Sequence, residues 1–303
     1  MKEKYPHLML IVNAICEKSA VQEKHIEKYL KSSDTAFFEF ADKFFGLYLK
    51  YLEKEGYSLN YAVDSYIKLC TDTLSEEIQF IKTGKYTMQS SEQALSEVYN
   101  NDDVMRAYMY GLAFSQFLWK NHYSIFNFYN DYLQKTESIR RYLEIGPGHG
   151  LFLWSAIKKF SHSIFTAIDL SSTSLELSQG FINFVFSNTQ NIAFINTNIY
   201  DWDCEDKFDF ITMGEVLEHV EDPCRLLKRL SDLLIADGNV FISTCINCPA
   251  VDHIYLFKNV DAIREIIRES GLRIKKELLL PLQSITETIN YAAILNKNDS
   301  FYS

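Results

Sequence analysis

The residues that could do chemistry in this chain lie where apolar runs typical of buried strands end. Gly146, Gly148 and Gly150 directly follow the apolar run Tyr142–Ile145. Glycine is needed where the backbone must approach a ligand closely, because a Cβ atom would block that approach. Asp169 follows a second apolar run, and a carboxylate at a strand end suits a bidentate grip on a ribose diol. These residues predict a site for a nucleotide-like cofactor.

Two further strand ends carry residues of matching chemistry. Asn198 and Ile199 follow a third apolar run, and an amide beside an apolar side chain suits the edge and the face of an adenine ring. A fourth run leads into Gly214–His219, which contains Glu215. Each feature alone has an ordinary explanation, such as a helix cap for Asp169 or a loop amide for Asn198. Their order along the chain favours one site at the carboxyl edge of a sheet.

The glycine spacing separates two classes of nucleotide cofactor. A dinucleotide fingerprint, G-x-G-x-x-G, would place its third glycine at position 151, where this chain has Leu151. The third glycine here is Gly150, so the pattern is G-x-G-x-G. The spacing therefore argues against a nicotinamide-dependent oxidoreductase on a related sheet.

The elements that must position these residues alternate between strand and helix over residues 138–303. Such alternation predicts a doubly wound α/β domain, a mostly parallel sheet with helices on both faces. The last two strands should form an antiparallel pair. Strands are predicted at 141–145, 163–168, 192–196, 208–213, 239–246, 272–280 and 291–296, and helices at 151–160, 172–187, 223–237 and 259–270.

Residues 1–137 show helical periodicity and almost no alternating strand pattern. Helices are predicted from Asp34 to about Gly56, over 61–80, and over 105–133 as one or two helices. We expect a separate all-α domain that caps the sheet domain.

The segment 105–129 is rich in Tyr, Trp and Met, whose polar atoms need partners when buried. The segment runs directly into the glycine-turn domain, so it is predicted to line a substrate pocket. Most of its aromatic side chains also have an ordinary interpretation as the core of a helical bundle. The substrate-contacting candidates in this segment and in the aromatic loop 247–257 are Tyr108, Met109, Trp119, Tyr123 and Tyr255.

The composition describes a globular protein of 303 residues, 47% hydrophobic and 23% charged, with a formal net charge of −10. Such acidity argues against non-specific nucleic-acid binding, which needs a basic face. The chain start has no signal-peptide pattern and Leu8–Cys16 is too short to span a membrane, so a cytoplasmic location and no membrane are expected. Cys245 and Cys248 form a C-x-x-C pair without a second pair or a spaced His. We interpret this pair as strand-end packing and predict no metal site.

The run Glu-Ile-Gly-Pro-Gly-His-Gly at 144–150 resembles the first motif of class I S-adenosylmethionine-dependent methyltransferases. So do Ala-Ile-Asp-Leu at 167–170, Asn-Thr-Asn-Ile at 196–199, and the stretch 208–223. That last stretch is most similar to the small-molecule type exemplified by the ubiquinone-pathway O-methyltransferases. The resemblance covers roughly 138–303 and leaves the N-terminal helices outside. One departure is Asn198, where many members carry Asp.

The resemblance implies S-adenosylmethionine as cofactor, S-adenosylhomocysteine as product, and a role for each strand end. Asp169 would hold the ribose hydroxyls, Leu170 and Ile199 would pack on adenine, and Glu215 would lie near the sulfonium. The residues implied in cofactor binding are Glu144, Gly146, Pro147, Gly148, Gly150, Asp169, Leu170, Asn198, Ile199 and Glu215.

The resemblance also implies methyl transfer to a small-molecule or modified-peptide acceptor, with oxygen preferred over nitrogen and carbon. A hydroxyl or amine nucleophile must lose a proton, and a positioned His can take it, whereas a carboxylate acceptor needs no base. His219, His253 and His122 are the candidate bases, although an anchoring role in the turn that follows the fourth strand is favoured for His219. His149 is interpreted as a neighbour of the cofactor.

Two readings from other classes stay open at this point. One is the nicotinamide-dependent oxidoreductase, which the glycine spacing disfavours. The other is a non-catalytic binding protein on the same fold, which the intact glycines, Glu144 and Asp169 disfavour. The expected partner is a small molecule or peptide, and an oligomer is possible.

Overall fold

A seven-stranded sheet forms the centre of the molecule, in a computed structural model that describes residues 3–297. The strand order is β3-β2-β1-β4-β5-β7-β6. Strands β1 to β5 pair in parallel, and β7 runs antiparallel to both β5 and β6. The predicted mostly parallel sheet with a closing antiparallel pair is confirmed. The strands are β1 (Arg141–Ile145), β2 (Ile164–Asp169), β3 (Ile192–Asn196), β4 (Phe208–Gly214), β5 (Leu234–Ile246), β6 (Leu272–Pro281) and β7 (Ile289–Lys297).

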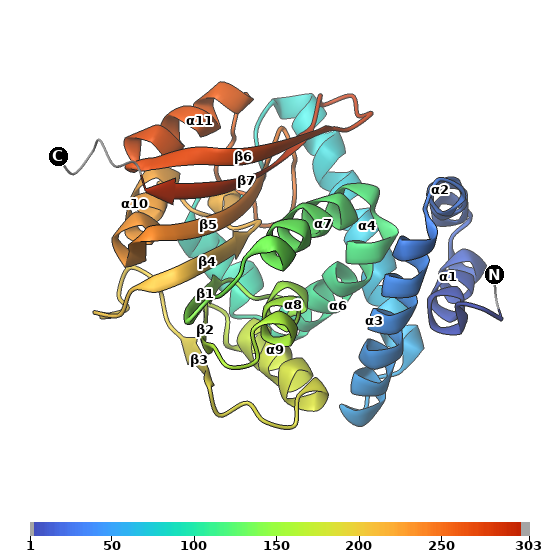
Figure 1. Ribbon diagram of the computed structural model, residues 1–303. Coiled ribbons are helices and arrows are strands. Elements are labelled where there is room, and N and C mark those ends of the chain that lie inside the picture. The colour runs from blue at the N-terminus through green and yellow to red at the C-terminus, as the bar shows by residue number, and fades with distance from the viewer. Residues whose placement is uncertain (1–2, 298–303) are drawn as a thin grey trace.

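Helices cover both faces of this sheet, and the earlier helices of the chain form an outer layer beside it (Figure 1). The N-terminal region consists of helices and connectors, as predicted. Its helices are α1 (Pro6–Lys18), α2 (Ala20–Lys31), α3 (Thr35–Lys54), α4 (Leu59–Thr83), α5 (Ser91–Ala94), the π-helix η1 (Leu95–Tyr99), α6 (Asp102–Leu118) and α7 (Lys120–Lys135). The later helices are α8 (Leu151–Lys159), α9 (Ser172–Val185), the 3₁₀ helix η2 (Leu217–His219), α10 (Pro223–Leu233) and α11 (Val260–Glu269).

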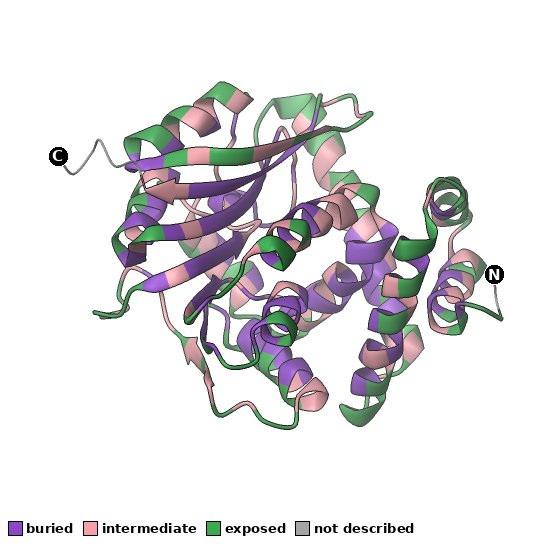
Figure 2. Ribbon diagram, viewed as in Figure 1, coloured by how far each residue is buried: buried purple, intermediate pink, exposed green. Residues whose placement is uncertain are grey.

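The side-chain alternation of the strands divides the interior into two hydrophobic cores. Tyr142 and Phe241 point into the core shared with the N-terminal helices, α8 and α9. Leu143 and Ile242, the residues that follow them, point into the core shared with α10 and α11. Figure 2 shows the central strands buried along most of their length, while α2 and the outer side of α11 are exposed. The sheet is therefore fixed from both sides.

One predicted boundary is wrong. The helix that begins at Pro223 was expected to end at Asp237 and Gly238, but α10 ends at Leu233 and Leu234 already pairs with Phe208 of β4. Gly238 lies inside β5, where a Cβ atom would come within 2.7 Å of the Leu234 side chain. The glycine therefore allows a close approach within an irregular strand instead of ending a helix.

The helical region and the sheet share one continuous core. The ring of Tyr129 on α7 lies 5.0 Å from that of Phe241 on β5, and its hydroxyl is 2.9 Å from that of Tyr142 on β1. On α3, the Tyr51 hydroxyl donates to the carbonyl oxygen of Leu177 on α9. The domain division after residue 137 stays a prediction. Within residues 3–297, no helix combines the length and apolarity that crossing a membrane requires.

Candidate active site

A cavity of about 770 Å³ lies at the carboxyl ends of β1, β2 and β4. The strand order reverses between β1 and β4, which is where open α/β sheets bind ligands. Helices α6 and α7 supply one wall, and the loop after β5 supplies another. All four strand ends singled out in the sequence therefore contribute to one cavity.

The glycine turn after β1 forms the floor of this cavity. Gly146 has φ of 67°, and a Cβ atom there would lie 2.9 Å from Cγ2 of Val216. Gly146, Pro147 and Gly148 all line the cavity. Gly150 does not belong to this lining: it precedes α8 with φ of 76° and faces Phe181 on α9. Its glycine is needed for backbone conformation at the helix start, so the predicted cofactor contact is not supported.

Asp169 ends β2 with its carboxylate at the cavity. The Ser174 hydroxyl donates to Oδ2 at 2.7 Å, and the Ser171 amide donates to Oδ1 at 2.9 Å. Burial nevertheless raises the pKa of Asp169 to about 6. The neighbouring Leu170 lines the same cavity and is 42% exposed, which leaves an apolar side chain available to a ring.

Glu144 lies on β1 beneath the glycine turn and is 2% exposed. The Tyr142 hydroxyl donates to its Oε2 atom at 2.7 Å. Burial raises the pKa of Glu144 to about 8. The carboxyl group lines the cavity and can therefore change its protonation when a ligand brings charge or hydrogen-bond donors.

The third strand end behaves differently from the prediction. Asn198 and Ile199 line the cavity, but the Asn198 side-chain oxygen accepts from the amide of Tyr200 at 3.0 Å. The side chain stabilises its own turn, so only part of its hydrogen-bonding capacity is left for a ligand. Tyr200 also lines this end of the cavity, and the Arg225 guanidinium lies 4.2 Å from the centre of its ring.

Glu215 follows β4 with a strained backbone, at φ of 52°. Its amide donates to the carbonyl oxygen of Ser243 at 3.0 Å, which holds this conformation against β5. Its Oε1 atom is buried and makes no hydrogen bond with any described residue. Burial raises the pKa of this carboxyl group. A strained residue with a free acceptor at a cavity wall is typical of a ligand-binding position.

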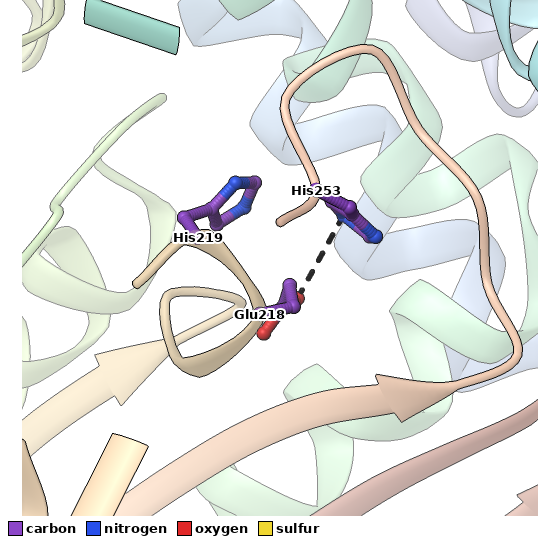
Figure 3. Close-up of side chains that lie close together, drawn as sticks. All are labelled: Glu218, His219 and His253. Carbon is purple, nitrogen blue, oxygen red and sulfur yellow. Dashed lines mark ion pairs between the residues drawn. The ribbon is translucent and has the colours of Figure 1, made fainter. Parts of the chain in front are cut away.

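Glu218, His219 and His253 lie close together beside Glu215 (Figure 3). Glu218 is fully buried, accepts from the Thr244 hydroxyl at 2.7 Å, and directs its other oxygen towards His253, with 4.0 Å between Oε1 and Nε2. Burial and then the nearby Glu215 carboxylate raise the pKa of Glu218. Burial lowers the pKa of His253 to about 4, so its imidazole is neutral near pH 7.

Both histidines are oriented by backbone carbonyl groups. His253 Nδ1 lies 2.5 Å from the oxygen of Cys248, and His219 Nδ1 lies 2.9 Å from that of Asp252. A proton on Nδ1 satisfies both contacts, and in the neutral ring of His253 the Nε2 atom then keeps a free lone pair. His219 holds the loop after β5 in place and also lines the cavity, so both roles considered for it agree with its position.

Asp252 is a site residue that the sequence did not reveal. It is 2% exposed, lines the cavity, and accepts from the hydroxyls of Tyr99 and Tyr108 at 3.3 Å each. These tyrosines belong to η1 and α6, so the contact joins the helical region to the sheet domain. An Asp in a loop gives no signal in a sequence, because its partners lie more than 140 positions away.

His122, Trp119, Met109 and His149 also line the cavity. Burial lowers the pKa of His122 to about 4 and that of His149 to about 3. The amide of Leu151 donates to His149 Nδ1 at 3.2 Å, which keeps that nitrogen unprotonated. Met109 lies beside Gly148 and Ser174, so the predicted helical segment reaches the cofactor end of the cavity, and Tyr108 lines the same cavity.

Two predicted substrate residues lie elsewhere. The Tyr123 ring packs against Phe37 at 4.9 Å, inside the helical core. Tyr255 packs against Phe257 at 4.7 Å on the other side of the sheet. Both tyrosines are close in sequence to residues that line the cavity, but their rings face a hydrophobic core. The structure therefore does not support a contact of either ring with the substrate.

The Glu218, His219 and His253 cluster offers one carboxylate and two imidazoles within 4.8 Å of one another. A second group of three combines Glu215, Glu218 and Cys245. Groups of this kind are able to bind a divalent cation, and the sequence prediction of no metal stays a prediction. The six cysteines are free, and Cys245 is buried at the end of β5, as strand-end packing predicts.

Comparison with known proteins agrees with this geometry. Residues 118–265 match the family model described as a methyltransferase domain. A ubiquinone biosynthesis O-methyltransferase from Vibrio campbellii is 25% identical over 144 residues, which cover 46% of this chain and 59% of the relative. The chain spans about half the length of the curated relatives it matches.

Two solved structures share the fold. The mitomycin 7-O-methyltransferase MmcR has a TM-score of 0.55 at 11% identity, covering 79% of this chain and 70% of that one. The N-methyltransferase NodS from Bradyrhizobium japonicum, in complex with S-adenosylhomocysteine, has a TM-score of 0.50 at 18% identity, covering 69% of this chain and all of that one. The glycine cradle, Asp169 and the unpaired oxygen of Glu215 suit the same class of cofactor.

Proposed function

We propose that this chain, a class I S-adenosylmethionine-dependent methyltransferase, methylates an oxygen atom of a small molecule or modified peptide enclosed beneath its N-terminal helices. The observation that carries the proposal is the single cavity of about 770 Å³. The glycine turn and Asp169 lie in it together with His219 and His253. A volume of this size is typical of small-molecule sites.

The cofactor end would be held by groups already described. Asp169 would accept from the ribose hydroxyls, and Leu170 and Ile199 would offer apolar contact to the adenine ring. Gly146 and Gly148 would leave room for the methionine part of the cofactor, and Glu215 would provide a carboxylate for the positive charge of the sulfonium. When bound, S-adenosylmethionine supplies an activated methyl group, so the protein mainly has to align the acceptor and exclude water.

His253 is our first candidate for the general base. Its Nδ1 proton is directed at the Cys248 carbonyl oxygen, and its Nε2 lone pair is free. After Nε2 takes a proton, the carboxyl group of Glu218 is close enough to stabilise the imidazolium. His219 and His122 remain as alternatives because both line the same cavity.

The test has a binding arm and a turnover arm. Calorimetric titration with S-adenosylhomocysteine should give tight binding, while NAD should not bind. Incubation of the protein with metabolite extracts and methyl-labelled S-adenosylmethionine, followed by mass spectrometry, should then identify a methylated product. Tight binding of NAD alone would refute the proposal, and a product labelled on nitrogen or carbon would correct the acceptor atom. An Asp169→Ala variant that kept full cofactor affinity would support a non-catalytic binding protein instead.

A further inference from the structure

The cavity is strongly unbalanced in charge. At the cofactor end it is lined by the carboxyl groups of Glu144, Asp169 and Glu215. Arg225 is the one Lys or Arg side chain among the described residues that line it, and this guanidinium lies over Tyr200 at the adenine end. S-adenosylmethionine carries a net positive charge and can offset part of this imbalance at its own end.

Asp252 is a further carboxyl group in the lining of this cavity. It lies on the loop after β5 and accepts from side chains of η1 and α6, next to the strand end of Asp169, where the Ser171 hydroxyl donates to the Tyr99 carbonyl oxygen. Its described partners are the hydroxyls of Tyr99 and Tyr108 and the ring of His219, whose Nδ1 atom lies 3.5 Å from Oδ2. None of these described partners is a Lys or Arg side chain.

A second observation is an unpaired carboxyl oxygen beside the same loop. Glu218 is fully buried, and its Oε1 atom makes no hydrogen bond with any described residue. That oxygen is directed towards His253, which forms part of the cavity wall (Figure 3). Burial raises the pKa of Glu218 and favours its neutral form, and a ligand that brought positive charge nearby would favour the ionised carboxylate instead.

The walls around Asp252 suit an ammonium group in a second way. Tyr99, Tyr108 and Trp119 all contribute aromatic rings to the lining of this cavity. Aromatic faces attract cations, most strongly where water is excluded. A cavity that combines a carboxylate with aromatic rings is therefore complementary to an alkylammonium group and unfavourable for a carboxylate or a phosphate.

We propose that the acceptor carries a protonated amine that is recognised by Asp252 and the rings of Tyr99 and Tyr108. This inference rests on the proposed function and names the acceptor class for the same cavity. The ammonium group is the recognition element, and the methyl group goes to a hydroxyl oxygen elsewhere on the acceptor, since a protonated amine has no lone pair. Anionic acceptors, including carboxylates and phosphate-bearing carriers, are disfavoured.

Three matched phenols test the charge preference directly. Tyramine, 4-ethylphenol and 4-hydroxyphenylacetate share a ring and a hydroxyl and differ mainly in charge. Each is titrated calorimetrically into the protein saturated with S-adenosylhomocysteine at pH 7.5. Tyramine should bind about tenfold or more tightly than 4-hydroxyphenylacetate, with 4-ethylphenol between them. Equal affinities, the reverse order, or no binding of tyramine would overturn the proposal.

Two variants assign the preference to Asp252. Asp252→Asn keeps a side-chain oxygen for the tyrosine hydroxyls and removes the charge, so the preference for tyramine should fall towards that for 4-ethylphenol. Glu205→Gln neutralises an exposed acid before β4, at the opposite edge of the sheet, and should keep the full preference. A preference that survives in a folded Asp252→Asn variant would overturn the role of Asp252.

The same experiments separate this proposal from the proposed function. Failure of S-adenosylhomocysteine to bind would refute the methyltransferase function. Binding of S-adenosylhomocysteine without a charge preference among the phenols would refute the amine acceptor alone. If Asp252→Asn does not fold, as judged by circular dichroism, the order of the three phenols on the natural protein still decides the question.

Discussion

The Nε2 atom of His253 lies 4.0 Å from Oε1 of Glu218, a buried carboxyl oxygen that makes no hydrogen bond with any described residue. The imidazole comes from the loop after β5 and the carboxyl group from η2, so the fold brings together two segments that are 35 positions apart. Because Cys248 orients the other ring nitrogen, the free lone pair of His253 has a defined direction. This pair is the basis of the first prediction.

We expect His253→Gln to lower kcat about 10²–10⁴-fold, the usual contribution of a general base. The affinity for S-adenosylhomocysteine should remain unchanged, because His253 is not among the groups proposed to hold the cofactor. Steady-state kinetics and calorimetry measure the two quantities on the same preparation. His162→Gln provides the control, since His162 is exposed. Unchanged kcat in His253→Gln would exclude His253 as the base.

A second prediction distinguishes anchoring from catalysis at His219. His219 Nδ1 lies 2.9 Å from the backbone oxygen of Asp252, so His219→Ala should loosen the loop that carries Asp252 and His253. Hydrogen exchange of residues 247–257 should accelerate, and the acceptor KM should rise more than kcat falls. A fall in kcat with unchanged loop exchange would instead assign a direct catalytic role to His219.

The sequence predicted the cofactor end of this site better than the acceptor end. Asp169 and Gly146 each lie in a local strand–turn pattern, and such a pattern predicts that the residue lies at the carboxyl edge of the sheet. Asp252 contacts Tyr99 and Tyr108 only through tertiary packing, so no local sequence pattern predicts that Asp252 belongs to the site. The same limit explains Tyr123, whose helical position is consistent with either the cavity or the core.

Gly150 and Gly238 show why glycine patterns mislead in detail. Gly150 has the spacing of a ligand-binding turn, yet its positive φ serves the start of α8. Gly238 has the place of a helix end, yet it allows β5 to pass close to Leu234. In both, the residue type reports a backbone requirement, and only the fold reveals which neighbour imposes it.

The pKa of Asp169 leads to a prediction about cofactor affinity. Burial raises this pKa to about 6, and the ribose hydroxyls are expected to donate to the ionised carboxylate. The affinity for S-adenosylhomocysteine should therefore be constant above pH 7 and weaken by up to about tenfold per pH unit below pH 6. Calorimetry between pH 5 and 8 measures this dependence. Asp169→Asn should bind weakly with a flat profile, and a natural protein with an equally flat profile would exclude this role.

The buried carboxyl group of Glu144 makes the unliganded protein less stable at alkaline pH. Folding raises its pKa from the usual 4.5 to about 8, so the folded state binds more protons than the unfolded chain between these values. The contribution of Glu144 to the stability of the fold is therefore most favourable below about pH 4.5 and is lost as pH rises through 8.

The variant Glu144→Gln keeps an acceptor for the Tyr142 hydroxyl and removes the charge. The free energy of unfolding of Glu144→Gln minus that of the natural protein should grow by about 1–3 kcal/mol between pH 5 and pH 8. Urea unfolding at both pH values measures this difference, with Glu205→Gln as the exposed control. A constant difference would show that Glu144 ionises without penalty in the folded state.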